Sequence, residues 1–368
     1  MDADPPARWQ PDTPMKTYIY TGSYTQPGNS NSQGIHIYCL DPSSGTLEFV
    51  EAAASGPNPS FMALHPNGRF LFAANELAEG LVSSFAVDPG SGRLSFLNRQ
   101  PVHGSAPCYL TCDPTGAWLL AANYGDGSLS VLPVHVDGSL GSLAQRVQHY
   151  GLGSDPQRQE GPHAHAVVFD PSGRFVLAAD LGIDRLNVYR FDGQSGQLLA
   201  HRPSGVAAIS GAGPRHLVFH PNGRTLYVSN ELNSTVTACS WNDQDGLLDS
   251  FQTLPTLPPG FPAGDAADIH LHPNGRTLYV SNRGHDSLAI FTVDQQDGSL
   301  IPNGHVSTAG KWPRNFALDP SGWFLLVANQ HSDSLVIFRL DPQTGIPAPT
   351  GEIISVPSPV FVMVKNVA

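Results

Sequence analysis

The sequence predicts an all-β fold, a seven-bladed β-propeller, from a hairpin pattern repeated six times, a second hairpin in each period, and two chain ends that complete a seventh unit. Each copy has an apolar run, a His-Pro or Asp-Pro step, a Gly two residues later and a second apolar run. Pro presets the φ of a tight turn and Gly supplies the positive φ that closes it, so each copy predicts a β-hairpin. The copies are residues 61–76, 109–124, 166–181, 216–231, 269–283 and 316–330.

The spacing of the copies identifies them as blades. Their turn prolines (Pro66, Pro114, Pro171, Pro221, Pro273 and Pro320) follow one another at intervals of 48, 57, 50, 52 and 47 residues. A period of about fifty residues made of strands is typical of propellers. A weaker hairpin, an alternating strand followed by an Asp- and Gly-containing turn, recurs at 80–98, 185–200, 288–302 and 335–349. We therefore expect four antiparallel strands in each blade.

The two chain ends together predict the seventh blade. Residues 16–24 match a second strand, and residues 34–50 match an outer hairpin. The missing innermost strand is supplied by the C-terminus, so residues 358–365 should pair with residues 17–24 and close the ring, which removes exposed sheet edges. We assign residues 15–368 to a single propeller domain and expect the Pro-containing residues 1–14 to form a disordered tail.

Composition narrows the class of protein. With 14% charged residues, 37 Gly and 33 Pro in 368 residues, the chain is turn-rich. The net charge of −12 disfavours nucleic acid as a partner, and no apolar stretch is long enough for a membrane span. The N-terminus lacks the features of a secretory signal. The four cysteines are too few and scattered for a disulfide framework. We expect a cytoplasmic protein, a monomer or weak homodimer.

Hairpin geometry predicts where functional residues lie. The start of each first strand and the end of each second strand should ring one mouth of the central channel. The turns should lie at the opposite face, where His65, His220 and His272 are expected to cap turns rather than bind metal.

Charged residues are scarce in this chain, yet they gather at the predicted mouth. The positions before the first strands are Ser60, Cys108, His165, Arg215, Ala267 with Asp268 beside it, and Arg314. The positions after the second strands are Tyr24, Glu76, Tyr124, Leu181, Glu231, Arg283 and Gln330. Arginine, histidine and glutamate converging on a concave mouth favour the binding and turnover of an anionic substrate. The alternative is structural, with Arg215 and Glu231 as an ion pair within one hairpin.

The neighbouring segment His163-Ala-His165 places two imidazoles at alternate positions of an extended chain. As a metal pair it lacks an obvious third ligand, because only Glu231 and Asp268 are nearby candidates. An acid–base or substrate-binding role is therefore favoured. The sequence has no GxSxG elbow and no Walker or dinucleotide glycine pattern.

Five segments of the chain form a recognisable set: YIYTGSYT (18–25), GPHAHAVVFDPSGRF (161–175), GAGPRHLVFHPNGRTLYVSNEL (211–232), AADIHLHPNGRTLYVSNR (266–283) and KWPRNFALDPSG (311–322). Through these segments the chain resembles, over residues 16–366, the seven-bladed β-propeller lactonase family, which includes propeller-type 6-phosphogluconolactonases and carboxy-muconate lactonising enzymes. The resemblance implies lactone chemistry with no metal or organic cofactor. It also implies an active-site set of His165, Arg215, Glu231 and Arg283.

Around this set we expect four substrate-binding residues: His163, Asp268, Arg314 and Glu76. The arginines would stabilise an oxyanion and hold an anionic group, and Glu231 or His165 would be the general base. Hydrolysis of 6-phosphogluconolactone to 6-phosphogluconate, a step of the pentose phosphate pathway, is the expected reaction. The alternatives are a muconate-type lactonising cycloisomerase and a non-enzymatic propeller that serves as a protein-interaction platform.

Overall fold

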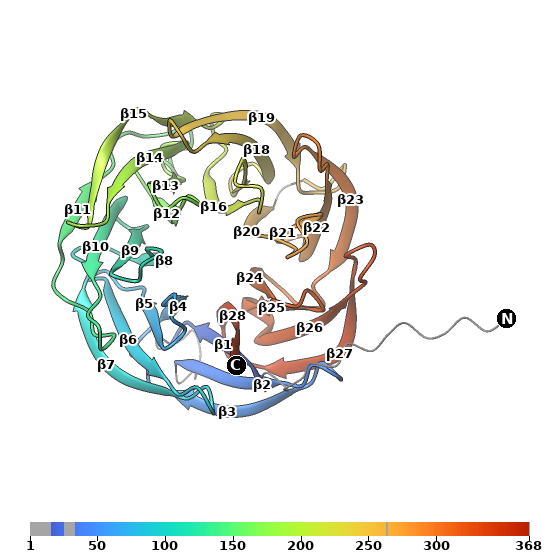
Figure 1. The fold of residues 1–368 in the computed structure, drawn as a ribbon. Coiled ribbons are helices and arrows are strands. Elements are labelled where there is room, and N and C mark those ends of the chain that lie inside the picture. The colour runs from blue at the N-terminus through green and yellow to red at the C-terminus, as the bar shows by residue number, and fades with distance from the viewer. Residues whose placement is uncertain (1–15, 26–33, 263, 368) are drawn as a thin grey trace.

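The computed structural model describes residues 16–25, 34–262 and 264–367. These residues form seven four-stranded antiparallel sheets arranged as blades around a central axis (Figure 1). The predicted fold class is confirmed. The expected tail of residues 1–14 lies outside the described residues, and the assignment of residues 15–368 to one domain stays a prediction.

Each blade contributes one strand to each of four concentric rings. In blade order, beginning with the blade that closes the ring, the innermost strands are β28 (Pro359–Val367), β4 (Pro59–Leu64), β8 (Pro107–Cys112), β12 (Ala164–Phe169), β16 (Pro214–Phe219), β20 (Asp265–Leu271) and β24 (Pro313–Leu318). The second strands, in the same order, are β1 (Lys16–Ser23), β5 (Phe70–Asn75), β9 (Trp118–Asn123), β13 (Phe175–Asp180), β17 (Thr225–Asn230), β21 (Thr277–Arg283) and β25 (Phe324–Asn329).

Two further rings lie outside these. The third strands are β2 (Ile35–Leu40), β6 (Leu81–Val87), β10 (Ser128–Pro133), β14 (Arg185–Asp192), β18 (Thr235–Asn242), β22 (Ser287–Val293) and β26 (Ser334–Leu340). The outer strands are β3 (Leu47–Ala53), β7 (Leu94–Pro101), β11 (Gln145–Gln148), β15 (Gln197–Ala207), β19 (Leu247–Pro255), β23 (Leu300–Ser307) and β27 (Pro347–Ser355). A 3₁₀ turn, η1 (Gln330–Ser332), follows β25.

The core lies between neighbouring blades. Second strands such as β5 and β25 are buried at every position, because each has a strand on either side and another blade against each face. This explains why they read as continuous apolar runs rather than as alternating patterns. The outer strands are exposed at many positions.

The two ends of the chain close the ring as predicted. Strand β28 pairs antiparallel with β1 from Lys16 opposite Val367 to Gly22 opposite Phe361. Figure 1 shows the red C-terminal strand beside the blue N-terminal one. The last strand therefore completes the blade that the first strand begins.

The turn histidines also take their predicted place. His65 accepts a hydrogen bond from the Asn67 amide through Nδ1, and its Nε2 donates to the Gly116 carbonyl of the next blade at 3.0 Å. His220 and His272 make the same contacts with Gly275 and Gly322. The histidines therefore cap turns and link adjacent blades.

A β-bulge near the start of each innermost strand shapes the mouth of the channel. In six blades the strand carries one residue without a partner in the register: Val360, Ser60, Cys108, His165, Arg215 and Arg314. In β20, Ala267 and Asp268 together face the single residue Ser281. Bulges re-aim side chains and often lie beside functional sites. Apart from Val360, these are the positions that the sequence places at the mouth.

Candidate active site

Polar side chains from all seven blades line a cavity of about 220 Å³, which we call the mouth cavity. Its lining residues are Tyr24, Glu76, Cys108, Tyr124, Arg158, His165, Glu231, Arg283 and Arg314. All except Arg158 occupy mouth positions predicted from the repeat. The geometry of the hairpins therefore brings together side chains that are distant in sequence.

Glu231 is the centre of the charge cluster. Its carboxylate accepts from Arg215 Nε at 2.9 Å and pairs with Arg283 Nη2 at 2.8 Å, both through Oε2. Arg158 donates to the other oxygen. Burial alone would raise the pKa of Glu231, but Arg283 and Arg215 hold it well below its ordinary value. Glu231 is therefore an ionised anchor for three guanidinium groups and a weak base.

The cluster holds more positive than negative groups. Four guanidinium groups, three lining the mouth cavity and Arg215 behind it, face the two carboxyl groups of Glu76 and Glu231. Arg314 packs over the Tyr24 ring at 5.6 Å and forms no salt bridge with any described residue. Arg283 is buried, and within the described ranges its Nε has no hydrogen-bond partner. An anionic ligand would satisfy both groups.

His165 is the titratable base of the mouth cavity. Burial, followed by the charge of Arg215, holds its pKa well below 6.5. The imidazole is therefore neutral at physiological pH. Its Nδ1 lies 3.7 Å from Cys108 Sγ, and its ring meets Tyr124 edge-on at 5.5 Å. Burial raises the pKa of Cys108, so this neighbour is a thiol rather than a thiolate.

Arg215 belongs to the cluster but does not line the mouth cavity. Its side chain is 2% exposed and pairs with Glu231. Its second contact is from Nη1 to His216 Nε2, at 3.2 Å. Burial and the neighbouring Arg283 lower its pKa to about 10, which leaves it charged at neutral pH. The expectation that Arg215 lines the pocket itself is not met, because Arg215 is absent from the cavity lining, although it contacts Glu231 and its charge acts on His165.

His163 also lies outside the cavity lining. It precedes the first residue of β12, and its ring stacks on Tyr124 at 4.5 Å. Its Nδ1 donates to the Tyr124 carbonyl at 2.8 Å, and Nε2 lies 3.2 Å from Glu160. Because both ring nitrogens have partners in the protein, His163 supports the wall of the cavity. A direct contact with substrate is not its role in this geometry.

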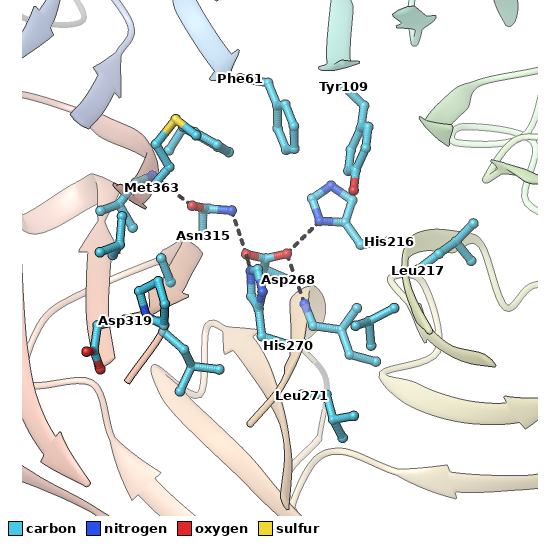
Figure 2. Close-up of a pocket in the computed structure, with 18 of the residues that line it drawn as sticks. Phe61, Tyr109, His216, Leu217, Asp268, His270, Leu271, Asn315, Asp319 and Met363 are labelled. Atoms are coloured by element: carbon cyan, nitrogen blue, oxygen red, sulfur yellow. Dashed lines mark hydrogen bonds and ion pairs between the residues drawn. The ribbon is translucent and has the colours of Figure 1, made fainter. Parts of the chain in front are cut away.

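The prediction that Asp268 lies at the mouth is wrong. It lines a second cavity of about 420 Å³ further along the channel, which we call the channel cavity (Figure 2). The reason is a shift of one residue relative to the bulge. Asp268 is equivalent to the residues that follow the bulge in other blades, and those residues line the same cavity: Phe61, Tyr109, His216 and Asn315.

Arg158 is the residue that sequence reasoning misses. It lies in the connection between β11 and β12, outside the repeated hairpins, and its side chain is 38% exposed. The longest interval between turn prolines, 57 residues from Pro114 to Pro171, is the signal that could have found it. The additional residues of this blade form the connection that carries an arginine over Glu231.

The comparisons with known proteins agree with this fold. The model of the family "Lactonase, 7-bladed beta-propeller" matches residues 18–364. The chain belongs to this lactonase family. Within the residues that the structure describes, no helix is long and apolar enough to cross a membrane, and no three His, Cys, Asp or Glu side chains are placed to hold a metal ion.

Individual relatives with lactonase names are similar to the chain over most of its length. The chain is 38% identical over 309 residues to the 6-phosphogluconolactonase of Bacillus subtilis, a match that covers 83% of this chain and 86% of the relative. A Formosa agariphila 6-phosphogluconolactonase is 34% identical, with 82% and 86% covered. The solved structure of the Pseudomonas aeruginosa periplasmic gluconolactonase is 35% identical, with a TM-score of 0.90 and 96% and 100% of the two chains covered.

Proposed function

We propose that this protein hydrolyses 6-phosphogluconolactone to 6-phosphogluconate in the mouth cavity. The observation that carries the proposal is the surplus of guanidinium groups over carboxylates around a neutral, buried His165. Such a site suits an anionic substrate whose carbonyl oxygen gains negative charge during the reaction. The names of the Bacillus and Formosa relatives support this choice of lactone.

The mechanism follows from the position of each group. His165 accepts a proton from a water molecule as that water attacks the lactone carbonyl carbon, which forms the new C–O bond. Arg283, whose buried Nε–H lacks a protein partner among the described residues, stabilises the oxyanion. The ring C–O bond then breaks, and protonated His165 returns the proton to the leaving alkoxide. Atoms and charge balance without another reactant.

The phosphate would bind at Arg314 and Arg158. Arg314 forms no salt bridge with the described residues, and half-exposed Arg158 stands at the edge of the cavity. Guanidinium groups suit phosphate because their parallel N–H groups match two of its oxygens. Glu76 accepts from the Tyr24 hydroxyl at 3.1 Å and fixes the ring on which Arg314 packs. Glu231 and Arg215 hold the remaining guanidinium groups in place.

The cellular setting follows from the substrate. A phosphorylated sugar lactone is charged and does not cross membranes, so the enzyme would act in the cytoplasm as part of the pentose phosphate pathway. The mechanism uses no metal or organic cofactor, and purified protein treated with a chelator should retain its activity.

The second candidate substrate is the unphosphorylated gluconolactone. It is favoured by the likeness to the Pseudomonas gluconolactonase at 35% identity. A muconate would engage the same arginines through its carboxylates, with lactone formation in place of hydrolysis. An interaction platform is disfavoured, because the charges converge inside a cavity rather than on an exposed rim.

One panel of assays tests the proposal. Initial rates are measured with 6-phosphogluconolactone, gluconolactone and a carboxy-muconate, and the spontaneous hydrolysis is subtracted. We expect the highest kcat/KM with the phosphorylated lactone, and an Arg283→Ala preparation serves as the control for contaminating activity. Equal kcat/KM for the two lactones would overturn the role given to phosphate. The absence of turnover above the Arg283→Ala level with every compound would overturn the enzymatic function.

A further inference from the structure

We propose that His216 and Asp268 are positioning residues that hold Arg215, and through it Glu231, in the geometry that the mouth cavity requires. The inference rests on the proposed function and gives a role to two residues, His216 and Asp268, that lie outside the mouth cavity. His216 and Asp268 line the channel cavity, and Arg215 links them to the cluster at the mouth.

Each hydrogen bond along this chain of residues has a fixed donor and a fixed acceptor. A guanidinium group only donates, so Arg215 Nη1 donates to His216 Nε2 at 3.2 Å. With Nε2 as the acceptor, the ring proton of a neutral His216 is on Nδ1. Nδ1 then donates to Asp268 Oδ1 at 2.7 Å (Figure 2). The aspartate therefore selects the imidazole tautomer that can receive Arg215.

The charge state of His216 agrees with this arrangement. Burial, and then the charge of Arg215, lower the pKa of His216 to about 4. A protonated imidazole would present an N–H to the Arg215 guanidinium and repel it. The neutral imidazole instead gives Nη1, a buried donor, a partner whose loss would be costly.

Donors within the protein already occupy most of the hydrogen-bonding capacity of the Asp268 carboxylate. Asp268 is 3% exposed, and its carboxylate accepts from His270 Nε2 at 2.9 Å and from the Asn315 side-chain amide. The backbone amides of Ile269 and Phe316 also donate to it. These contacts tie β16, β20 and β24 together and leave little capacity for a ligand. Its position and contacts suit an anchor, not a substrate-binding group.

The far end of the chain of contacts is Glu231. Arg215 donates to it through Nε, so a guanidinium held at Nη1 has little freedom to turn away. Glu231 in turn holds Arg283 and Arg158. Loss of the side-chain hydrogen bonds of His216 or Asp268 should therefore shift the arginines that line the mouth cavity.

Two substitutions of His216 separate positioning from packing. The side-chain oxygen of Gln can occupy the place of Nε2 and accept from Arg215, so His216→Gln should retain kcat within about threefold. The amide of Asn reaches only the place of Nδ1, so His216→Asn should lower kcat about 10- to 100-fold, as loss of a supporting contact does. His220→Asn is the matched control, because it changes a buried histidine at the turn end of β16 and should leave kcat unchanged.

A double-mutant cycle tests the route through Arg215. Asp268→Asn, which can present an N–H to His216, should lower kcat about 10- to 100-fold in the wild-type background. In an Arg215→Ala background the same change should lower kcat less than about twofold, because the residue it acts through is gone. Equal effects in both backgrounds would overturn the proposal, and so would a folded His216→Asn variant with wild-type kcat. If Asp268→Asn fails to fold, the two His216 variants decide.

A binding measurement keeps this inference separate from the proposed function. Inorganic phosphate is titrated into wild type, His216→Asn, His216→Gln and His220→Asn by calorimetry. We expect His216→Asn alone to raise Kd at least about fivefold, whether or not the wild type hydrolyses a lactone. A wild type without lactonase activity would overturn the proposed function. An unchanged Kd for His216→Asn would overturn the positioning role.

Discussion

Arg215 and Glu231 face each other across the hairpin of β16 and β17, and the arginine Nε donates to the glutamate Oε2 at 2.9 Å. The bulge at Arg215 turns its side chain toward the residue that follows β17. Because both side chains are almost fully buried, the pair is screened little by solvent. The pair is the link between the supporting residues in the channel and the arginines at the mouth.

Replacing Glu231 by Gln should release the arginine cluster. The change leaves Arg158, Arg215 and Arg283 without their shared carboxylate, so we expect kcat/KM to fall about 100-fold and the free energy of unfolding to fall by about 3–5 kcal/mol, as for a broken buried ion pair. Activity assays and urea unfolding measure the two effects.

The control for Glu231→Gln is Glu51→Gln, which breaks the exposed pair with Arg93 and should cost less than about 1 kcal/mol. Added inorganic phosphate should raise the Tm of Glu231→Gln less than that of the wild type, since the arginines that bind phosphate are no longer held in place. Equal Tm shifts for the two proteins would contradict the account of Glu231 as an anchor.

Arg283→Ala should lower kcat on the phosphorylated lactone about 100-fold or more, as loss of an oxyanion donor does. Arg283→Lys keeps the charge but lacks the Nε–H, so it should recover only part of the loss. Steady-state kinetics with both variants separate the charge from the hydrogen bond. Full activity of Arg283→Lys would show that the Nε–H has no special role.

The pH profile should report the lowered pKa of His165. Because the neutral imidazole is the base, kcat/KM should be constant from about pH 6 to 8 and fall only as the pH approaches that pKa. His165→Asn should lose at least about 100-fold in rate and also lose the acid limb. A half-maximal rate near pH 6.5 in the wild type would contradict the assignment.

The same shift has a consequence for stability. Unfolded His165 binds a proton near pH 6.5, whereas the folded protein resists protonation there. The stabilising contribution of the neutral histidine is therefore fully present above pH 6.5 and is lost as the pH falls toward the folded pKa. Tm measured from about pH 7 to about pH 5 should fall less steeply for His165→Asn than for the wild type.

Arg158→Ala should alter substrate preference rather than abolish turnover. Its guanidinium stands at the edge of the mouth cavity, where we place the phosphate. We expect KM for 6-phosphogluconolactone to rise about tenfold, with a smaller effect on gluconolactone, as loss of a charge-assisted contact to phosphate predicts. The same proportional change for both lactones would remove Arg158 from phosphate recognition.

Deleting residues 359–368 should destabilise the ring. The deletion removes β28, the partner of β1, and exposes an unpaired strand edge, so the shortened protein should aggregate. Light scattering during heating measures this effect, and a variant lacking residues 1–14, which precede β1, is the control. Wild-type thermal behaviour after the C-terminal deletion would contradict the role given to β28.

The fold can be predicted from the sequence because the spacing of the repeated hairpins gives the length of one blade. The mouth positions follow from hairpin geometry. The exceptions have local causes. Arg158 lies in a connection that the repeat does not describe. The repeat misplaces Asp268 because a bulge shifts the strand by one residue, and such a shift sends a side chain to a different level of the channel. The burial of Arg215 outside the cavity lining depends on packing that spacing alone does not encode.

A crystal structure with the product 6-phosphogluconate bound is the most decisive experiment, because it locates both ends of the ligand. We expect the phosphate beside Arg314 and Arg158, and the carboxylate within hydrogen-bond distance of Arg283 and close to His165. Product bound in the channel cavity beside Asp268, with the mouth cavity empty, would contradict it.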